Sequence, residues 1–392
     1  MPAEPLFARL PAQPPDPLLA LIGQFRADPR PGKIDLGVGV YRDAAGATPV
    51  LAAVKRAEAL LLKTQDSKSY LGGEGDRGFV ALLEPLVFGE GRADPRLTGI
   101  QTPGGTGALR VGMELAARAR EDATLWVGAP TWANHIPTAR AAGLAVRTHR
   151  FFDQARQAIE IDAMLDDLGE ARPGDIVLLH GCGHNPSGAT LDHADWRRIA
   201  ALVAERRLVP FVDLAYQGLA RGLDADAAGL RLLLAAAQEA LVAYSCDKNF
   251  GLYRDRVGAL WVKAADADAA ARARATMLAV GRTCWSMPPD HGAAVVRLIL
   301  ASPELRACWE AELEAMSWRI VDLREAVAAA EPRLAPLARQ SGMFSLLPIT
   351  AEAVAALRER HGIYMAGDGR INVAGLQLAD IPRFVAALAP WL

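Results

Sequence analysis

The stretch SCDKNFGLYRDR at residues 245–256 combines a reactive amine with an anion-binding group. Lys248 and Arg256 lie eight residues apart among small, polar and aromatic residues. A lysine amine can act as a nucleophile that forms a Schiff base with a carbonyl compound, and a guanidinium binds phosphate or carboxylate groups. The same pair of residues is also typical of a solvated surface. Three further stretches bear on the choice between these interpretations.

The stretches TPGGTGALR at 102–110 and HGCGHNPSG at 180–188 each carry groups suited to a ligand site. Gly105 and Thr106 precede an amphipathic helical pattern, and unpaired N–H groups at a glycine-rich helix start bind anions. Asn185 precedes a proline, which favours an extended backbone and an amide that points into a pocket. The alternatives are an ordinary glycine-rich turn and a simple Asn-Pro turn.

The stretch FVDLAYQG at 211–218 ends a hydrophobic run with Asp213 and carries Tyr216 three residues later. A carboxylate at a buried strand end needs a cationic or hydrogen-bonding partner. Asp213 is therefore either a structural residue whose carboxylate is hydrogen-bonded within the fold, or the partner of a ring nitrogen that must stay protonated. Together the four stretches supply a phosphate site, an amine, a carboxylate and a phenol, which are the groups that a pyridoxal phosphate site requires.

The elements that position these groups follow from the hydrophobic pattern. From residue 96 onward, short β-branched runs alternate with amphipathic helical stretches. This alternation is typical of a mostly parallel sheet with flanking helices, in which ligands bind at the carboxyl ends of the strands. The predicted strands are TGIQT, TLWVGA, LAVRTH, DIVLLH, LVPFVD, LVAYS and VGALWV, and the predicted helices include 105–120, 131–142 and 192–206.

The length of the chain predicts two domains, because 392 residues exceed what one hydrophobic core usually organises. Residues 1–45 are rich in loops, and a long helical pattern at 303–330 leads into short strands and two more helices. We therefore predict a large cofactor-binding domain at 46–302. Residues 1–45 and 303–392 are expected to pack together as a smaller α/β domain, with the site in the cleft between the two.

Composition and charge argue against several other classes of protein. A net charge of −2 offers no basic surface for nucleic acid, and no apolar run is long enough to span a membrane. The first thirty or so residues lack the order of a signal peptide, which predicts a cytoplasmic protein. Cys182, Cys246, Cys284 and Cys308 show neither paired nor metal-type spacing, so we interpret them as buried or incidental thiols and predict no metal.

From about residue 16 to its end, the sequence resembles class I (fold type I) pyridoxal-phosphate aminotransferases, specifically the aspartate and aromatic amino acid branch. The resemblance implies a PLP-dependent transferase fold type I and a homodimer with shared active sites. It also implies that Lys248 holds the cofactor as a Schiff base and then moves a proton. The blocks that carry the resemblance are GVGVYRD, YLGGEG, QTPGGTGALR, HGCGHNPSG, DLAYQGLARG, KNFGLYRDRVGA, MPPDHGA, GMFS and GRINVAG.

The resemblance assigns further roles around the cofactor, with Lys248, Asp213 and Tyr216 as the catalytic residues. Asp213 would pair with the pyridinium nitrogen, and His135 would orient Asp213. Tyr216 and Asn185 would hydrogen-bond the phenolic oxygen of the ring, and Trp132 would stack on its face. The phosphate would be held by Gly105, Thr106, Ser245 and Arg256, with Tyr70 arriving from a partner subunit.

Two arginines are expected to select the substrate. Arg370, in GRINVAG, matches the clamp of the family for the α-carboxylate and is helped by the backbone at Gly39, with Trp132 and Asn185 also touching substrate. Arg282 matches the arginine that a partner subunit supplies for a distal carboxylate, which favours aspartate, glutamate, oxaloacetate and 2-oxoglutarate. A surface arginine at a helix end is the alternative interpretation of Arg282.

The residues expected around the side chain of the substrate, here called the distal pocket, point to two different classes of substrate. Trp285 stands where the family usually has tyrosine, and Met287 where it usually has a small polar residue, which makes aromatic substrates plausible. Three other residues expected there look like the aspartate type: Val40, Arg42 and Thr48. We predict transamination between aspartate and/or aromatic amino acids and 2-oxoglutarate, with aspartate slightly favoured.

Other functions remain open at this point. The first alternative is an aromatic (tyrosine or phenylalanine) aminotransferase with weak aspartate activity, and the second is a β-lyase or decarboxylase on the same fold. The third is a non-catalytic binding module. Asp247 departs from the family, which commonly has serine there. We expect its carboxylate to turn away from the phosphate toward Arg254 or Arg256, so that Asp247→Ser tightens cofactor binding by about tenfold or less.

Overall fold

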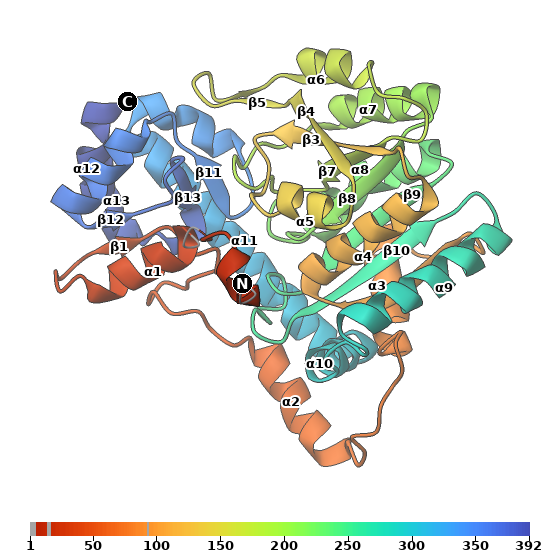
Figure 1. Cartoon of the computed structure of the whole chain (residues 1–392). Helices are drawn as coiled ribbons and strands as arrows, with labels where there is room; N and C mark the ends of the chain where they lie inside the picture. Colours follow the sequence, from red (N-terminus) through yellow and green to blue (C-terminus); the bar gives the residue numbers. More distant parts are fainter. Residues whose placement is uncertain (1–4, 14–16, 92–93) are drawn as a thin grey trace.

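The computed structural model of the chain describes residues 5–13, 17–91 and 94–392. A seven-stranded sheet with the strand order β2-β10-β9-β8-β7-β3-β4 forms its centre (Figure 1). Only β10 runs antiparallel to its neighbours, so the predicted mostly parallel sheet is confirmed. The strands coincide with the seven predicted runs: β2 Leu97–Pro103, β3 Thr124–Ala129, β4 Ala145–Arg150, β7 Ile176–His180, β8 Val209–Leu214, β9 Ala240–Ser245 and β10 Val257–Lys263.

Helices cover both faces of this sheet, which is why its central strands are hydrophobic throughout. Successive residues of β9 point to opposite faces: Leu241 and Ala243 pack in one core, and Val242 and Tyr244 in the other. The first core contains residues of α4 Gly104–Ala119, α5 His135–Ala141 and α9 Ala267–Cys284. The second contains residues of α2 Ala52–Thr64, α3 Arg77–Phe88, α6 Ile161–Leu168, α7 His193–Arg206, α8 Leu223–Ala236, α10 His291–Ala301 and α11 Pro303–Ala330.

A third core joins the two ends of the chain. Its buried residues include Ile34 and Leu36 from the N-terminal part, together with side chains between Leu323 and Leu388. The red and blue segments accordingly lie side by side in Figure 1. The elements here are α1 Pro17–Ala27, α12 Ala351–His361 and α13 Ile381–Leu388, with β1 Ile34–Asp35 parallel to β12 Ile363–Tyr364 and β11 Phe344–Leu346 antiparallel to β13 Arg370–Asn372.

The expected domain boundaries at 45/46 and 302/303 stay a prediction, and residues 1–4, 14–16 and 92–93 lie outside the described part of the chain. A short hairpin is formed by β5 Phe152–Asp153 and β6 Ala158–Ile159, and 3₁₀ helices occupy Leu6–Arg9, Pro332–Arg339, Val373–Gly375, Leu378–Asp380 and Ala389–Trp391. Helix α1 was not predicted within the loop-rich N-terminal region. Over the described residues, every helix is too short or too polar to cross a membrane.

Local signals set the ends of several helices. Asp192 and Asp195 form a capping box at the start of α7, each side chain accepting a hydrogen bond from the other residue's backbone N–H. Ser302 caps α11, whose first residue is a proline that needs no hydrogen-bond partner for its nitrogen. Gly362 ends α12 in a left-handed conformation, at φ +66°. The first two caps fix where α7 and α11 begin, and Gly362 fixes where α12 ends.

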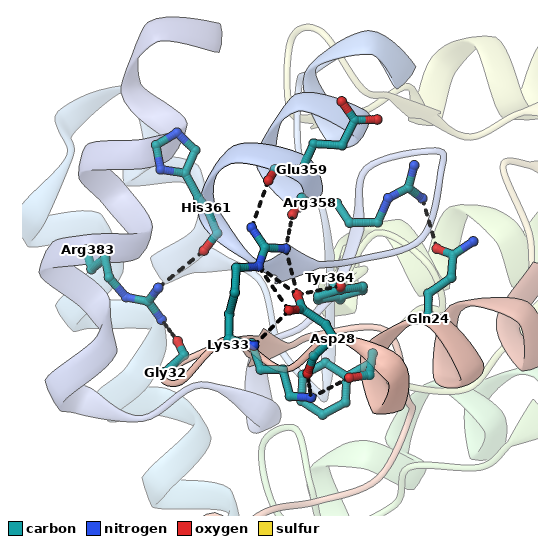
Figure 2. Close-up of polar contacts among 11 residues, drawn as sticks. Gln24, Asp28, Gly32, Lys33, Arg358, Glu359, His361, Tyr364 and Arg383 are labelled. Carbon is teal, nitrogen blue, oxygen red and sulfur yellow. Dashed lines mark hydrogen bonds and ion pairs between the residues drawn. The ribbon is translucent and has the colours of Figure 1, made fainter.

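A group of polar contacts attaches α1 to the end of α12 (Figure 2). The Asp28 carboxylate accepts hydrogen bonds from the Arg30 guanidinium and, at 2.7 Å, from the Tyr364 hydroxyl. Arg30 also donates to backbone carbonyls in the last turn of α12, and Lys33 donates to carbonyls at the end of α1. The Arg30 hydrogen bonds hold the pKa of Asp28 well below its usual range. Both helix ends are thereby satisfied by cations.

Arg324 holds the loop that enters the site from the third core. This arginine of α11 is 1% exposed, and its guanidinium donates to the Ser345 hydroxyl at 2.8 Å. It also donates to the carbonyls of Gly342 at 2.7 Å and Phe344 at 2.6 Å. Burial lowers the pKa of Arg324 to about 9. The hydrogen bonds must therefore compensate for the burial of this side chain.

We expect Arg324→Met to lower the free energy of unfolding by about 2–4 kcal/mol, because several buried acceptors lose their donor. Urea unfolding followed by circular dichroism measures this change. The control is Arg306→Met on the same helix, where the guanidinium pairs with Glu310 near the surface and the loss should stay below about 1 kcal/mol. Equal effects of the two substitutions would show that Arg324 does not support the loop.

Candidate active site

A cavity of about 380 Å³ lies at the carboxyl ends of the central strands. Its walls come from the sheet, from the N-terminus of α4 and from both ends of the chain. The predicted site residues that line it are Gly39, Gly105, Thr106, Trp132, Asn185, Asp213, Tyr216, Ser245, Lys248, Arg256 and Arg370. The sequence therefore predicted residues that the fold brings together, although the role of each stays a prediction.

Asp213 is held at the floor of the cavity by His135. The Nε2 atom of His135 lies 3.1 Å from the Asp213 carboxylate, and its Nδ1 lies 2.7 Å from the Thr131 hydroxyl. Because a carboxylate only accepts, the Nε2–H group of His135 donates to Asp213. Burial raises the pKa of Asp213, but the hydrogen bond from His135 and the neighbouring basic side chains more than offset this effect. The pKa therefore lies below its ordinary value and Asp213 is ionised.

His180 stands beside this pair and is neutral. Burial and the neighbouring His135 lower the pKa of His180 to about 3. Possible ligand atoms of His135, His180 and Asp213 all lie within 4.8 Å of one another, which is close enough for a metal ion. Both ring nitrogens of His135 are already used in hydrogen bonds to Thr131 and Asp213. This geometry favours a carboxylate held for an organic ligand over a metal site.

Lys248 follows β9 and directs its amine into the cavity. Its Nζ lies 3.5 Å from the Ser245 hydroxyl and 5.6 Å from the centre of the Tyr216 ring. Burial lowers the pKa of Lys248 below its usual value, and the charges of Asp247 and Asp213 oppose that shift only in part. A lower pKa favours the neutral amine, which is the form that attacks a carbonyl or removes a proton.

A polar chain runs from Arg370 across the cavity to Tyr216. The Arg370 guanidinium lies 3.4 Å from the side-chain oxygen Oδ1 of Asn185, and the side-chain nitrogen Nδ2 of Asn185 lies 3.5 Å from the Tyr216 hydroxyl. The Nε of Arg370 is buried without a partner in the described structure. Burial raises the pKa of Tyr216, which keeps its phenol protonated. The Nη1 and Nη2 atoms of Arg370 each donate one hydrogen bond, to Asn185 and to the Gly37 carbonyl, so each keeps a second N–H group for a carboxylate of a ligand.

Six residues that line the cavity were not named by the sequence reasoning: Leu18, Val38, Leu109, His180, Ala215 and Phe344. Phe344 packs against Tyr216, with ring centres 5.9 Å apart, and lies 4.9 Å below the Arg370 guanidinium. Leu18 of α1 also lines the cavity. Phe344 leaves no room for a side chain at Gly39, where a Cβ would come within 2.9 Å of the ring. The GMFS block was the only signal for Phe344, and Leu18 had none.

The opposite end of the cavity is built on the first turn of α4. Gly105 would place a Cβ only 3.2 Å from the Cβ of Ser245, so a larger residue would narrow this end. Asp247 lines the cavity here and pairs with Arg256. The predicted pairing of Asp247 with Arg256 is confirmed, and the expected turn of the carboxylate away from the phosphate stays a prediction. Hydrogen bonds from Arg256 and from the Val257 N–H, at 3.1 Å, hold the carboxylate in the cavity wall.

Tyr70 and Arg282 lie outside the cavity of their own chain. Tyr70 is 93% exposed, and Arg282 is exposed near the end of α9, where it donates to Ser286 at 3.2 Å. The two residues belong to neighbouring surface segments, because the Leu71 N–H lies 3.2 Å from the Met287 sulfur. Other residues expected near the distal pocket also lie outside this cavity: Val40, Arg42, Thr48, Trp285 and Met287.

Comparison with known proteins yields full-length matches. Residues 31–388 match the family model for aminotransferase class I and II. The chain is 52% identical over 379 residues to the tyrosine aminotransferase of Rhizobium meliloti (strain 1021), covering 96% of this chain and 97% of that protein. It is 44% identical over 380 residues to the aspartate aminotransferase of Escherichia coli (strain K12), with 95% and 96% covered.

A solved structure shows the same fold. The aromatic-amino-acid aminotransferase from Burkholderia pseudomallei, covalently bound to pyridoxal phosphate, superposes with a TM-score of 0.96. The two sequences are 38% identical, and the match covers 99% of both chains. The fold expected from the sequence is thereby confirmed.

We expect the Lys248 amine to titrate below 10.5. Its acetylation rate as a function of pH, followed by mass spectrometry, should show an inflection below that value, because burial disfavours the charged form. In Asp213→Asn the inflection should move further down, since the protonated amine loses a stabilising negative charge. The exposed Lys63 reports the labelling efficiency in the same digest. An inflection at or above 10.5 would contradict this prediction.

Proposed function

The chain belongs to the class I and II aminotransferase family, and we propose that it transfers amino groups between aspartate or aromatic amino acids and 2-oxoglutarate. One observation carries this proposal: the Lys248 amine lies in one cavity between an ionised Asp213 and an anion-binding helix start. The family uses pyridoxal phosphate, and a relative with the same fold is described as covalently bound to it. We infer the same cofactor for this chain.

The residues of the cavity fit pyridoxal phosphate. The N–H groups of α4, the Ser245 hydroxyl and the Arg256 guanidinium would hold the phosphate, with the narrow space at Gly105 as its cradle. Asp213 would hold a proton on the ring nitrogen, and Trp132 would cover the ring. When bound, the cofactor supplies an electron sink that acidifies the hydrogen on the substrate Cα.

The protein residues would then bind substrate and move protons. Lys248 would hold the cofactor covalently, and its amine, once free, would carry the proton to and from Cα. Arg370 would bind the α-carboxylate with the second N–H groups of Nη1 and Nη2, which its own chain leaves unused. The Tyr216 hydroxyl and the Asn185 amide would hydrogen-bond the oxygen on the ring, which fixes its orientation.

We further propose a homodimer in which Tyr70 and Arg282 enter the site of the partner. Their exposure and their neighbouring positions support this assembly, because two groups with no role in their own cavity share one surface region. Arg282 would bind the distal carboxylate of aspartate, glutamate or their 2-oxo acids. The expected cytoplasmic location and the absence of nucleic-acid binding stay predictions.

A second candidate is an aromatic aminotransferase with weak aspartate activity. The tyrosine aminotransferase relative at 52% identity favours it, as do the apolar residues Trp285 and Met287 beside Arg282 in the chain. Values of kcat/KM for aspartate, phenylalanine and tyrosine against 2-oxoglutarate decide between the two. A non-catalytic module is disfavoured, because Lys248, Asp213 and Arg370 all line the cavity.

We expect Lys248→Ala to lose turnover by at least about 10²-fold, which is the lower end of what general acid–base catalysis contributes. Borohydride should link pyridoxal phosphate to the parent protein but not to this variant, as shown by mass spectrometry. The control Lys63→Ala removes an exposed lysine and should keep both properties. Turnover of Lys248→Ala within tenfold of the parent would contradict the catalytic role assigned to Lys248.

We expect Arg282→Ala to reduce kcat/KM for aspartate by about two to four decades, since charge-assisted hydrogen bonds contribute roughly 1.5–3 kcal/mol each. Phenylalanine has no distal carboxylate and should be affected far less. The control is Arg272→Ala, an exposed arginine of the same helix. Equal losses for both substrates would mean that Arg282 has a structural role only.

Mixed dimers test whether Arg282 acts in the partner's site. Lys248→Ala subunits still carry Arg282, and Arg282→Ala subunits still carry Lys248. A heterodimer of the two therefore contains one complete site if the sites are shared, and aspartate turnover should reappear after mixing. Mixtures that stay as inactive as the separate variants would argue that Arg282 serves its own chain.

A further inference from the structure

Asp247 places a buried negative charge at the end of the cavity where the phosphate is expected. Its side chain is 3% exposed and forms an ion pair with the Arg256 guanidinium. The backbone N–H of Asp247 also lies 3.2 Å from the Ser245 hydroxyl oxygen. The same residue thus engages both of the side chains that would bind phosphate.

The carboxylate also lies at the first turn of α4. Gly104 has φ +67°, and a Cβ there would come within 2.7 Å of Arg256 Nη2 and 3.1 Å of Asp247 Oδ2. The ion pair therefore packs directly against the residue that begins the helix. Unpaired N–H groups at a helix start and the helix dipole both attract anions. Asp247 supplies an anion of the protein itself at this position.

Two anions in one small site compete for the same cation. Arg256 is the cation in contact with Asp247, and it is also the arginine that would bind the phosphate. A carboxylate that already neutralises this guanidinium reduces its attraction for a second anion. Hydrogen bonds from Arg256 and the Val257 N–H keep the carboxylate in place, so it does not simply swing out when a ligand enters.

We propose that the Asp247 carboxylate competes with the cofactor phosphate for Arg256. This competition weakens the binding of pyridoxal phosphate and acts on the phosphate group alone. This inference rests on the proposed function, because it takes pyridoxal phosphate as the ligand. Asp247 balances the charge of Arg256 in the cofactor-free site, and the phosphate has to share that arginine. The site therefore distinguishes less between the phosphorylated cofactor and pyridoxal than a site with a neutral residue at 247 does.

The test compares two ligands that differ only in the phosphate. Dissociation constants of pyridoxal phosphate and pyridoxal are measured by equilibrium dialysis for the full-length parent, Asp247→Asn and Asp247→Ser. Asparagine keeps an acceptor for the Val257 N–H, so it removes the charge with the least change of shape. Serine removes both the charge and the longer side chain. Thermal unfolding checks that each variant is folded.

We expect Asp247→Asn and Asp247→Ser to bind pyridoxal phosphate about tenfold more tightly, since a repulsive charge is removed. Pyridoxal binding should change by less than about twofold. Inorganic phosphate should also compete with pyridoxal phosphate more strongly in the variants than in the parent. The control Asp255→Asn removes a carboxylate of the same loop that does not line the cavity, and both constants should stay near those of the parent.

Two results overturn the inference. If pyridoxal phosphate binding changes by less than twofold in a folded variant, Asp247 does not oppose the phosphate. If the dissociation constant of pyridoxal changes by the same factor as that of pyridoxal phosphate, Asp247 affects only the shape of the cavity. Failure of the proposed function looks different, because then the parent itself would show no binding of pyridoxal phosphate and no borohydride-dependent link to Lys248.

Discussion

The buried carboxylate of Asp213 is the constraint on which the rest of the site depends. An ionised group at the end of a central strand is stable only if the fold surrounds it with donors and cations. Strand register provides them: Asp213 pairs with His180 on β7 and with Ala243 on β9, two residues before Ser245. A slip of one residue would turn Asp213 to the other face of the sheet. The order of these three strands thus sets where the carboxylate of Asp213 meets the cavity.

The substrate side of the cavity depends on a second constraint, which is the joining of the two chain ends. Arg370 contacts the carbonyl of Gly37 at 3.3 Å, across more than 300 residues of sequence. The third core, the contacts of Asp28 and the hydrogen bonds of Arg324 bring these segments together. A loop holds a side chain in one precise position only when several packing contacts and hydrogen bonds fix that loop. The position of Arg370 therefore depends on these remote contacts as much as on its own hydrogen bonds.

The sequence predicted the sheet and most of the cavity because both leave local signals. Hydrophobic runs marked all seven strands, and reactive residues directly followed several of them. Leu18 could not be found in this way, because one aliphatic residue in a helix carries no chemical signature. The hydrogen bond from the Val257 N–H to Asp247 was not predicted, because only the pairing of β9 and β10 brings these two residues close. The roles proposed for Tyr70 and Arg282 require a second chain, and the hydrophobic pattern of one chain carries no signal for such a contact.

The electrostatics of Lys248 show why a carboxylate at 247 is compatible with catalysis. Burial lowers the pKa of this amine, Asp247 and Asp213 raise it, and Arg256 lowers it again. Asp247 and Arg256 form one ion pair, so their effects on the amine oppose each other and the pair acts on it nearly as a neutral unit. Burial and Asp213 then remain as the main opposing influences. The charge at 247 can therefore act on the phosphate end of the cavity while the ion pair with Arg256 limits its effect on the pKa of the amine.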